Sequence, residues 1–181
     1  ANTRMNLLPY IYSQSIESVN NYEPLMRSLS VEFDDDSFDN CFDQFMFGQS
    51  LMIAPIIEEG ETKREIKLPS GTWIDFWSNK KVSGNQTIQV ESQTSEIPVY
   101  VRENSVVLLN LGKDKQIGSN ISNDIDSYCN LKILITASKS FTKQVKDHLG
   151  NEFVVIVNYE LNQVNIEVNN QMTYDVELIL V

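Results

Sequence analysis

The chain has 181 residues, of which 41% are hydrophobic, so it can build one medium domain or two small ones and is not expected to be disordered. Its formal net charge is −11, from 25 acidic and 14 basic residues, which argues against nucleic acid and anionic membranes as partners because like charges repel. No apolar run approaches the roughly 20 residues that a membrane-spanning helix needs.

Cysteine and histidine are too few to form a disulfide framework or a zinc site. Cys41 and Cys129 are expected to be small buried apolar residues. His148 lies in the polar turn DHLGN, without metal-ligand spacing to another residue, and is expected on the surface. The sequence therefore predicts no metal and no cofactor.

Residues 1–48 show a helix–strand–helix pattern, which is typical of an α/β fold. One helical face is expected from Met5, Leu8, Tyr12, Ile16 and Val19, which recur at steps of three and four. Pro9 fits if the helix starts just before it, and Asn20, Asn21 and Pro24 end it. Alternation from Leu25 to Phe33 predicts a strand, and Phe38 to Met46 predicts a second helix capped by Gly48.

Residues 49–111 lose the helical period and read as short strands divided by turns. The expected strands are LMIAPII, EIKLP, GTWIDFW, TIQVES, IPVYVRE and SVVLLN, with Gly60, Gly71 and Gly84 between them. This pattern predicts a β-sandwich.

Residues 112–181 open with a polar linker or long loop, KDKQIGSNISNDID, and continue as five strands. The expected strands are LKILIT, FTKQVKD, EFVVIVNYE, QVNIEVN and YDVELILV, with hairpin turns at DHLGNE and YELNQ. The fold class is therefore mainly β: two β-sandwich-type domains, 49–111 and 112–181, after a short α/β segment.

That α/β segment cannot close a sheet of its own, because a single strand leaves its backbone groups without partners. We therefore expect residues 1–48 to be the last piece of a larger domain. They should present an apolar surface that the missing domain, or a second copy of the chain, would cover.

Five sequence segments keep their order and spacing as in the late part of glycoside hydrolase family 31: RMNLLPYIYSQSI, EPLMRSLSVEF, DQFMFGQSLMIAPIIEEG, IKLPSGTWIDFW and IPVYVRENSVV. The resemblance covers roughly Arg4 to Leu109 and departs at Asn104, where the family usually has glycine. Both residues tolerate positive φ, so the turn should survive. The region after Leu111 resembles the family far less specifically.

The resemblance implies that residues 1–48 end a (β/α)8 barrel, followed by proximal and distal C-terminal β-domains. It also implies a parent enzyme that retains configuration while hydrolysing terminal α-linked glucose or xylose of an oligosaccharide. Retention needs two carboxyl groups about 5–5.5 Å apart. The family's two aspartates lie upstream of the Leu-Pro-Tyr helix, so no catalytic, substrate-binding, cofactor-binding or metal residue is carried over, and this chain alone is expected to be structural.

Three groups of residues nevertheless invite a functional interpretation. The acidic run Asp34, Asp35, Asp36, Asp39 and Asp43 lacks the glycine and glutamate of an EF-hand and is expected to be a solvated loop, with Asp43 bracing it locally. Arg27 could serve an active site, although a structural ion pair is favoured. Trp73, Phe76 and Trp77 could form a sugar-stacking platform, although core packing is favoured, and Tyr100 and Arg102 are expected at an interface with the barrel.

Two other functional hypotheses remain open on the sequence. An independent carbohydrate-binding β-sandwich would expose an aromatic pair and bind sugars by itself. A purely structural interaction module has no residue that argues for it. Glucose and xylose differ by a hydroxymethyl group, and no residue in this chain is expected to distinguish them.

Overall fold

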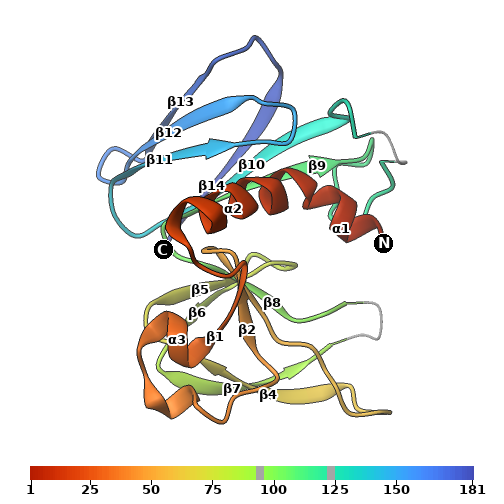
Figure 1. The fold of residues 1–181 in the computed structure, drawn as a ribbon, viewed down its shortest axis with the longest axis vertical. Helices are drawn as coiled ribbons and strands as arrows, with labels where there is room; N and C mark the ends of the chain where they lie inside the picture. Colours follow the sequence, from red (N-terminus) through yellow and green to blue (C-terminus); the bar gives the residue numbers. More distant parts are fainter. Residues whose placement is uncertain (93–95, 122–124) are drawn as a thin grey trace. The chain divides into compact units, whose positions relative to one another are not determined.

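A computed structural model describes residues 1–92, 96–121 and 125–181 (Figure 1). The described chain is mainly β and divides into two compact units, which we describe separately. Unit 1 comprises Ala1–Glu23 and Asn104–Val181, and unit 2 comprises Pro24–Glu103. These units differ from the predicted boundaries after residues 48 and 111, because residues 1–23 pack with the last part of the chain and residues 24–48 pair their strands with unit 2.

Unit 2 is built on a six-stranded antiparallel sheet. Its order is β1 (Met26–Ser28), β2 (Phe45–Phe47), β3 (Leu51–Ile53), β8 (Val99–Arg102), β5 (Thr72–Asp75) and β6 (Lys81–Ser83). A two-stranded ladder of β4 (Lys63–Leu68) and β7 (Gln86–Glu91) contributes Ile66 and Leu68 to the same core as Met46, Met52 and Trp73. The predicted β-rich organisation is therefore present, with β6 as a strand that the sequence patterns missed.

Two predicted elements in residues 25–48 are wrong. Strand structure stops at Ser28, and helix α3 (Leu29–Phe33) follows, because the Ser28 side chain caps it by accepting a hydrogen bond from the Val31 amide. A 3-10 turn (Asp36–Phe38) and strand β2 occupy the region predicted as a second helix. Gly48, at φ 63°, lies in the turn between β2 and β3 and caps no helix.

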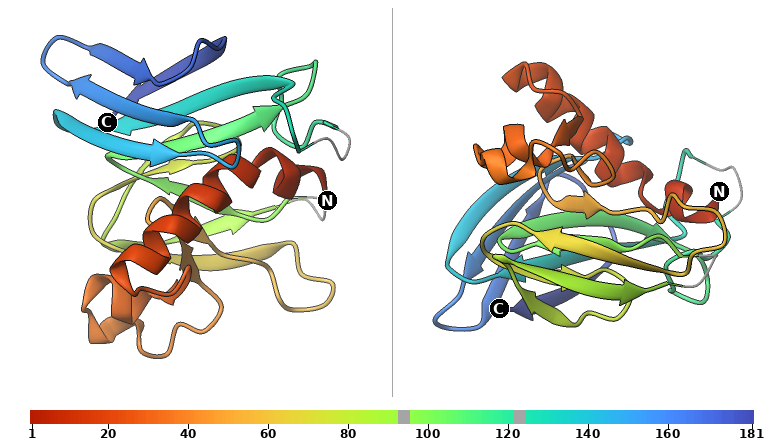
Figure 2. Two further views of the ribbon diagram at one scale, coloured as in Figure 1. Left: turned by 45° about the horizontal axis from the view of Figure 1, so that its top comes forward. Right: turned by 90° about the horizontal axis from the view of Figure 1, so that it is seen from below.

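Unit 1 contains two three-stranded sheets that stack as layers (Figures 1 and 2). One sheet has the order β14 (Tyr174–Leu180), β10 (Asn130–Ala137), β9 (Ser105–Leu111), and the other has β11 (Phe141–Lys146), β12 (Glu152–Asn158), β13 (Gln163–Val168). Alternate residues of both sheets, such as Ile133 and Val155, form one core. The five predicted strands are confirmed, while residues 122–124 of the predicted linker lie outside the described residues.

Helices α1 (Asn2–Asn6) and α2 (Leu8–Asn21) belong to unit 1, where α2 contacts β9 and β11. The start of α2 before Pro9 and its end at Tyr22, a left-handed residue at φ 57°, agree with the sequence. The buried face is a different one from the predicted apolar face: the buried residues are Pro9, Tyr10, Ser13 and Gln14. Tyr12 is 42% exposed and Val19 is 73% exposed. Much of the apolar stripe therefore faces away from the core of unit 1.

Asn6 fastens α1 to the chain that follows β9. Its side chain is fully buried, and its Nδ2 donates to the carbonyl oxygens of Asn110, at 2.7 Å, and Ser119, at 3.1 Å. Its Oδ1 accepts from the Gly118 amide at 2.8 Å. One amide side chain thus satisfies three backbone groups around a buried position.

We expect Asn6→Ala to lower the free energy of unfolding by about 2–3 kcal/mol, because it leaves buried backbone groups without partners. Urea unfolding followed by circular dichroism measures the change. Asn165→Ala, which alters an exposed asparagine of β13 in the same unit, is the matched control and should change stability by less than about 0.5 kcal/mol. Equal effects of the two substitutions would contradict this role for Asn6.

Candidate functional site

Arg27 forms a structural ion pair, as the sequence favoured. Its partner, Glu32, lies in the same unit, unit 2. Its Nε is 2.7 Å from Glu32 Oε2, and the other oxygen of Glu32 is 2.7 Å from an Arg102 terminal nitrogen. The Arg27 and Glu32 side chains are only 7% and 13% exposed, respectively. Arg27 also donates to the carbonyl oxygens of Pro24 and Gly48. Both carboxylate oxygens of Glu32 are therefore bound by an arginine, and the contacts hold α3 to β1 and β8. Glu32 thus has the environment of a structural anchor.

The acidic run does not gather into a metal site. Among the described residues, no group of three His, Cys, Asp or Glu side chains could hold a metal ion. Asp35 is exposed and caps its own turn through the Ser37 amide, and the hydrogen bonds from Ser37 lower the pKa of its carboxyl. Asp43 pairs with Arg64 of β4 at 2.8 Å, so it braces a contact with a strand 21 residues further along the chain and not a local one.

Two of the three aromatic residues considered for a sugar-stacking platform are not exposed. Trp73 and Phe76 are buried in the core, which confirms the favoured interpretation, and the Trp73 indole donates to the Pro69 carbonyl at 2.9 Å. Strand β5 ends at Asp75, so Trp77 leaves the predicted alternation and donates its indole N–H to the Ile97 carbonyl. Tyr100 is 2% exposed, and burial followed by the nearby Asp75 raises its pKa to about 12.

Three smaller predictions have clear outcomes. Asn104 takes the left-handed conformation at φ 58°, so the turn survives the departure from glycine, and its side chain also binds Ser138. Cys41 is half-buried, whereas Cys129 is exposed, which contradicts its expected burial. His148 is not a simple surface residue, because both ring nitrogens are buried, neither has a hydrogen-bond partner within the described part of the chain, and the ring packs against Tyr128.

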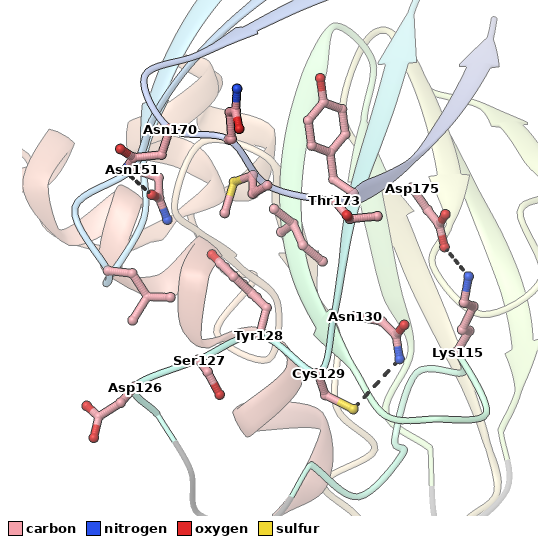
Figure 3. Close-up of a pocket in the computed structure, with 15 residues that line it drawn as sticks. Lys115, Asp126, Ser127, Tyr128, Cys129, Asn130, Asn151, Asn170, Thr173 and Asp175 are labelled. Carbon is pink, nitrogen blue, oxygen red and sulfur yellow. Dashed lines mark hydrogen bonds and ion pairs between the residues drawn. The ribbon is translucent and has the colours of Figure 1, made fainter.

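Unit 1 contains a pocket of about 560 Å³ that the sequence did not predict, at one end of its two sheets (Figure 3). We call it the distal pocket. Its polar lining includes Tyr128, Asn151, Asn170, Gln171, Thr173 and Asp175. The volume falls within the range of about 300–1,000 Å³ that is usual for small-molecule sites.

A fully buried carboxylate, Asp147, organises one wall of the distal pocket. Its Oδ1 accepts from the backbone amides of Leu149 and Asn151, at 2.9 and 2.8 Å. Its Oδ2 accepts from the Tyr128 hydroxyl and the Asn151 side-chain amide, both at 2.7 Å. Burial, followed by the hydrogen bond to Asp147, raises the pKa of Tyr128 well above its usual range, so the hydroxyl keeps its proton.

The hydrogen-bond chain continues from the buried wall to the rim. Asn170 is exposed and donates its side-chain N–H to Asn151 Oδ1 at 2.7 Å (Figure 3). On the opposite side, the Lys115 ammonium lies 2.7 Å from Asp175 Oδ2. The sequence identified DHLGN as a turn, and that is correct, but only the fold brings Tyr128 and Asn170 to it.

Residues 22–107 match the model of the glycosyl hydrolase family 31 C-terminal domain. The chain belongs to glycoside hydrolase family 31. The isomaltosyltransferase of Sporosarcina globispora is 37% identical over 169 residues, covering 92% of this chain and 15% of that protein. The α-xylosidase of Saccharolobus solfataricus is 37% identical over 113 residues, covering 61% of this chain and 15% of that protein.

Among solved structures, the cycloalternan-forming enzyme from Listeria monocytogenes, in complex with a pentasaccharide substrate, superposes with a TM-score of 0.83 at 30% identity. That match covers 91% of this chain and 16% of the enzyme. The chain therefore spans about one sixth of the length of these relatives. Likeness to family members extends beyond the family-model match into the last part of the chain, further than the sequence segments had indicated.

We expect Glu32→Gln to lower the free energy of unfolding by about 3 kcal/mol, because the buried Arg27 guanidinium loses its countercharge. Chemical unfolding followed by tryptophan fluorescence reports on unit 2, which contains both tryptophans. Asp36→Asn makes the same change at an exposed position and should alter stability by less than about 0.5 kcal/mol. A loss below about 1 kcal/mol for Glu32→Gln would show that the two-arginine contact is not an anchor.

Proposed function

We propose that this chain is the non-catalytic C-terminal part of a family 31 enzyme that processes α-linked glucosides or xylosides with retention of configuration. The family-model match over residues 22–107 carries this proposal. The relatives named above are glycosidases and glycosyltransferases several times longer than this chain. In this proposal the catalytic barrel, with both carboxyl groups, precedes the matched segment, and exposed apolar side chains of residues 1–48 pack against it.

The contacts of acidic side chains between residues 32 and 43 support a non-catalytic role. A retaining enzyme needs one carboxylate free to attack and a second that exchanges a proton. Glu32 is held between two arginines, and Asp43 is paired with Arg64. Asp35 is fully exposed and caps a turn, without the burial that tunes a catalytic acid.

Exposed apolar side chains support the proposal that a large further domain packs against this chain. Eleven large apolar residues of the described chain are well exposed, and six of them lie in residues 1–48, about a quarter of the sequence. Those six are Tyr12, Val19, Tyr22, Met26, Val31 and Phe42. Exposed apolar groups that recur in one segment mark surfaces that bind a partner. The missing barrel is the partner we propose, and a second copy of the chain is the alternative.

Transglycosylation is the second candidate activity, and one of the sequence relatives favours it. The isomaltosyltransferase matches in sequence over 92% of this chain, whereas the α-xylosidase of Saccharolobus solfataricus matches over 61%. An enzyme of either kind forms the same glycosyl intermediate and differs in whether water or a sugar hydroxyl accepts the glycosyl group.

We expect the 181-residue chain to release no product from isomaltotriose or from an aryl α-xyloside, because in this proposal the catalytic carboxyl pair lies in the barrel. The longer enzyme that carries this segment should convert at least one of them. Chromatography of its products from isomaltotriose separates the two candidates: glucose indicates hydrolysis, and longer oligosaccharides indicate transfer. Turnover by the 181-residue chain alone would contradict the non-catalytic role.

We also expect the double substitution Val31→Ser and Phe42→Ser to reduce binding of a hydrophobic dye and self-association of the chain, because these side chains are 72% and 87% exposed. The free energy of unfolding should change little. Leu161→Ser, at a 62% exposed apolar residue outside residues 1–48, is the control and should leave both readouts nearly unchanged. Equal effects of the control would reject a special binding role for this surface.

A further inference from the structure

We propose that the distal pocket of unit 1 binds a neutral glucosyl unit of an oligosaccharide. The choice of a glucosyl sugar rests on the proposed function, whereas the existence and chemistry of the site rest on the pocket itself. Three features of the pocket suit such a ligand: a rigid wall, exposed polar groups that match hydroxyls, and a lysine whose charge is already paired.

The wall is rigid because the buried carboxylate of Asp147 holds it through hydrogen bonds. Asp147 is fully buried and accepts four hydrogen bonds, two of them from side chains that line the pocket, Tyr128 and Asn151. The Tyr128 hydroxyl gives its only proton to Asp147, so toward a ligand it can act only as an acceptor. Polar groups fixed before binding lose little conformational entropy when a ligand arrives.

The rim offers polar groups that the described protein does not use. Gln171 and Thr173 are exposed, and within the described residues their side chains make no hydrogen bond. Asn170 makes only its bond to Asn151 there, which leaves its side-chain carbonyl available. Amides and hydroxyls both donate and accept, and so do sugar hydroxyls. Leu149, Met172 and the Tyr128 ring add apolar surface for the C–H face of a sugar ring.

The charges around the pocket disfavour anions and metal ions as ligands. Lys115 is paired with Asp175, so the cation at this rim is already neutralised. The chain also carries a net charge of −11, which disfavours phosphates and other anions. Among the described residues, no cluster of ligands suits a metal ion. An uncharged polyhydroxyl compound is the ligand class that best fits this polar lining.

Titration of the 181-residue chain with isomaltotriose, followed by NMR of backbone amides and by calorimetry, tests the proposal. We expect saturable shifts confined to residues 126–131, 149–151 and 170–175. The double substitution Asn170→Ala and Gln171→Ala should weaken binding about tenfold, as expected when two rim hydrogen bonds are lost. It changes exposed residues, so folding should persist. Asn165→Ala is the matched control and should leave the dissociation constant within about twofold.

Three results would overturn the proposal: no saturable shift, shifts elsewhere on the chain, or equal shifts with glycerol at the same hydroxyl concentration. Unchanged affinity in the double variant would do so as well. The result of this binding experiment can be told apart from the result of the test of the proposed function. An active longer enzyme with no binding by the chain rejects the pocket alone, whereas saturable binding with an enzyme inactive on α-glycosides rejects the proposed function alone.

Discussion

Unit 2 depends on one carboxylate shared between two arginines. Glu32 comes from the short helix α3, Arg27 from strand β1, and Arg102 from strand β8, 70 residues further along the chain than Glu32. The shared carboxylate holds a three-residue edge strand and a five-residue helix, which have little stability of their own, to the centre of the sheet. Arg102 also lies over the Phe33 ring, so the same contact positions an aromatic side chain against Trp73. The polar anchor and the apolar core therefore support each other.

Sequence patterns predicted the last strands of the chain correctly but failed between residues 25 and 48. Strands β9 to β14 are six to eight residues long and pair with neighbours in sequence or with β10, so apolar runs of strand length and turn residues sufficed to predict them. Between residues 25 and 48, alternation of apolar residues suggested one strand and helical spacing suggested one helix. Tertiary pairing of β2 between β1 and β3 overrode the second pattern, and the Ser28 cap overrode the first.

The candidate site was harder to predict, for a physical reason. Family resemblance correctly identified the parent family but pointed away from catalytic residues in this chain. The distal pocket combines Tyr128, the Asp147 turn and Asn170, which come from three separate connections. No local spacing joins them. The pairing of β12 with β11 and β13, together with that of β10 with β14, places these connections at one end of the sheets. The one local signal, an aspartate four residues before an asparagine in a turn, is common to many hairpins.

Helix α2 links the fold to the proposed function. Its buried face is partly polar, with Ser13 and Gln14 among the residues packed into unit 1, while Tyr12 and Val19 of its apolar stripe are exposed. A helix whose apolar side remains in water gains less from folding than its sequence allows. Covering that stripe with a barrel would recover this stabilisation, whereas covering it with a second copy would do so only at high concentration. In the proposed function the barrel is attached to the chain and would have a high effective concentration, which favours it over a second copy as the partner of Tyr12 and Val19.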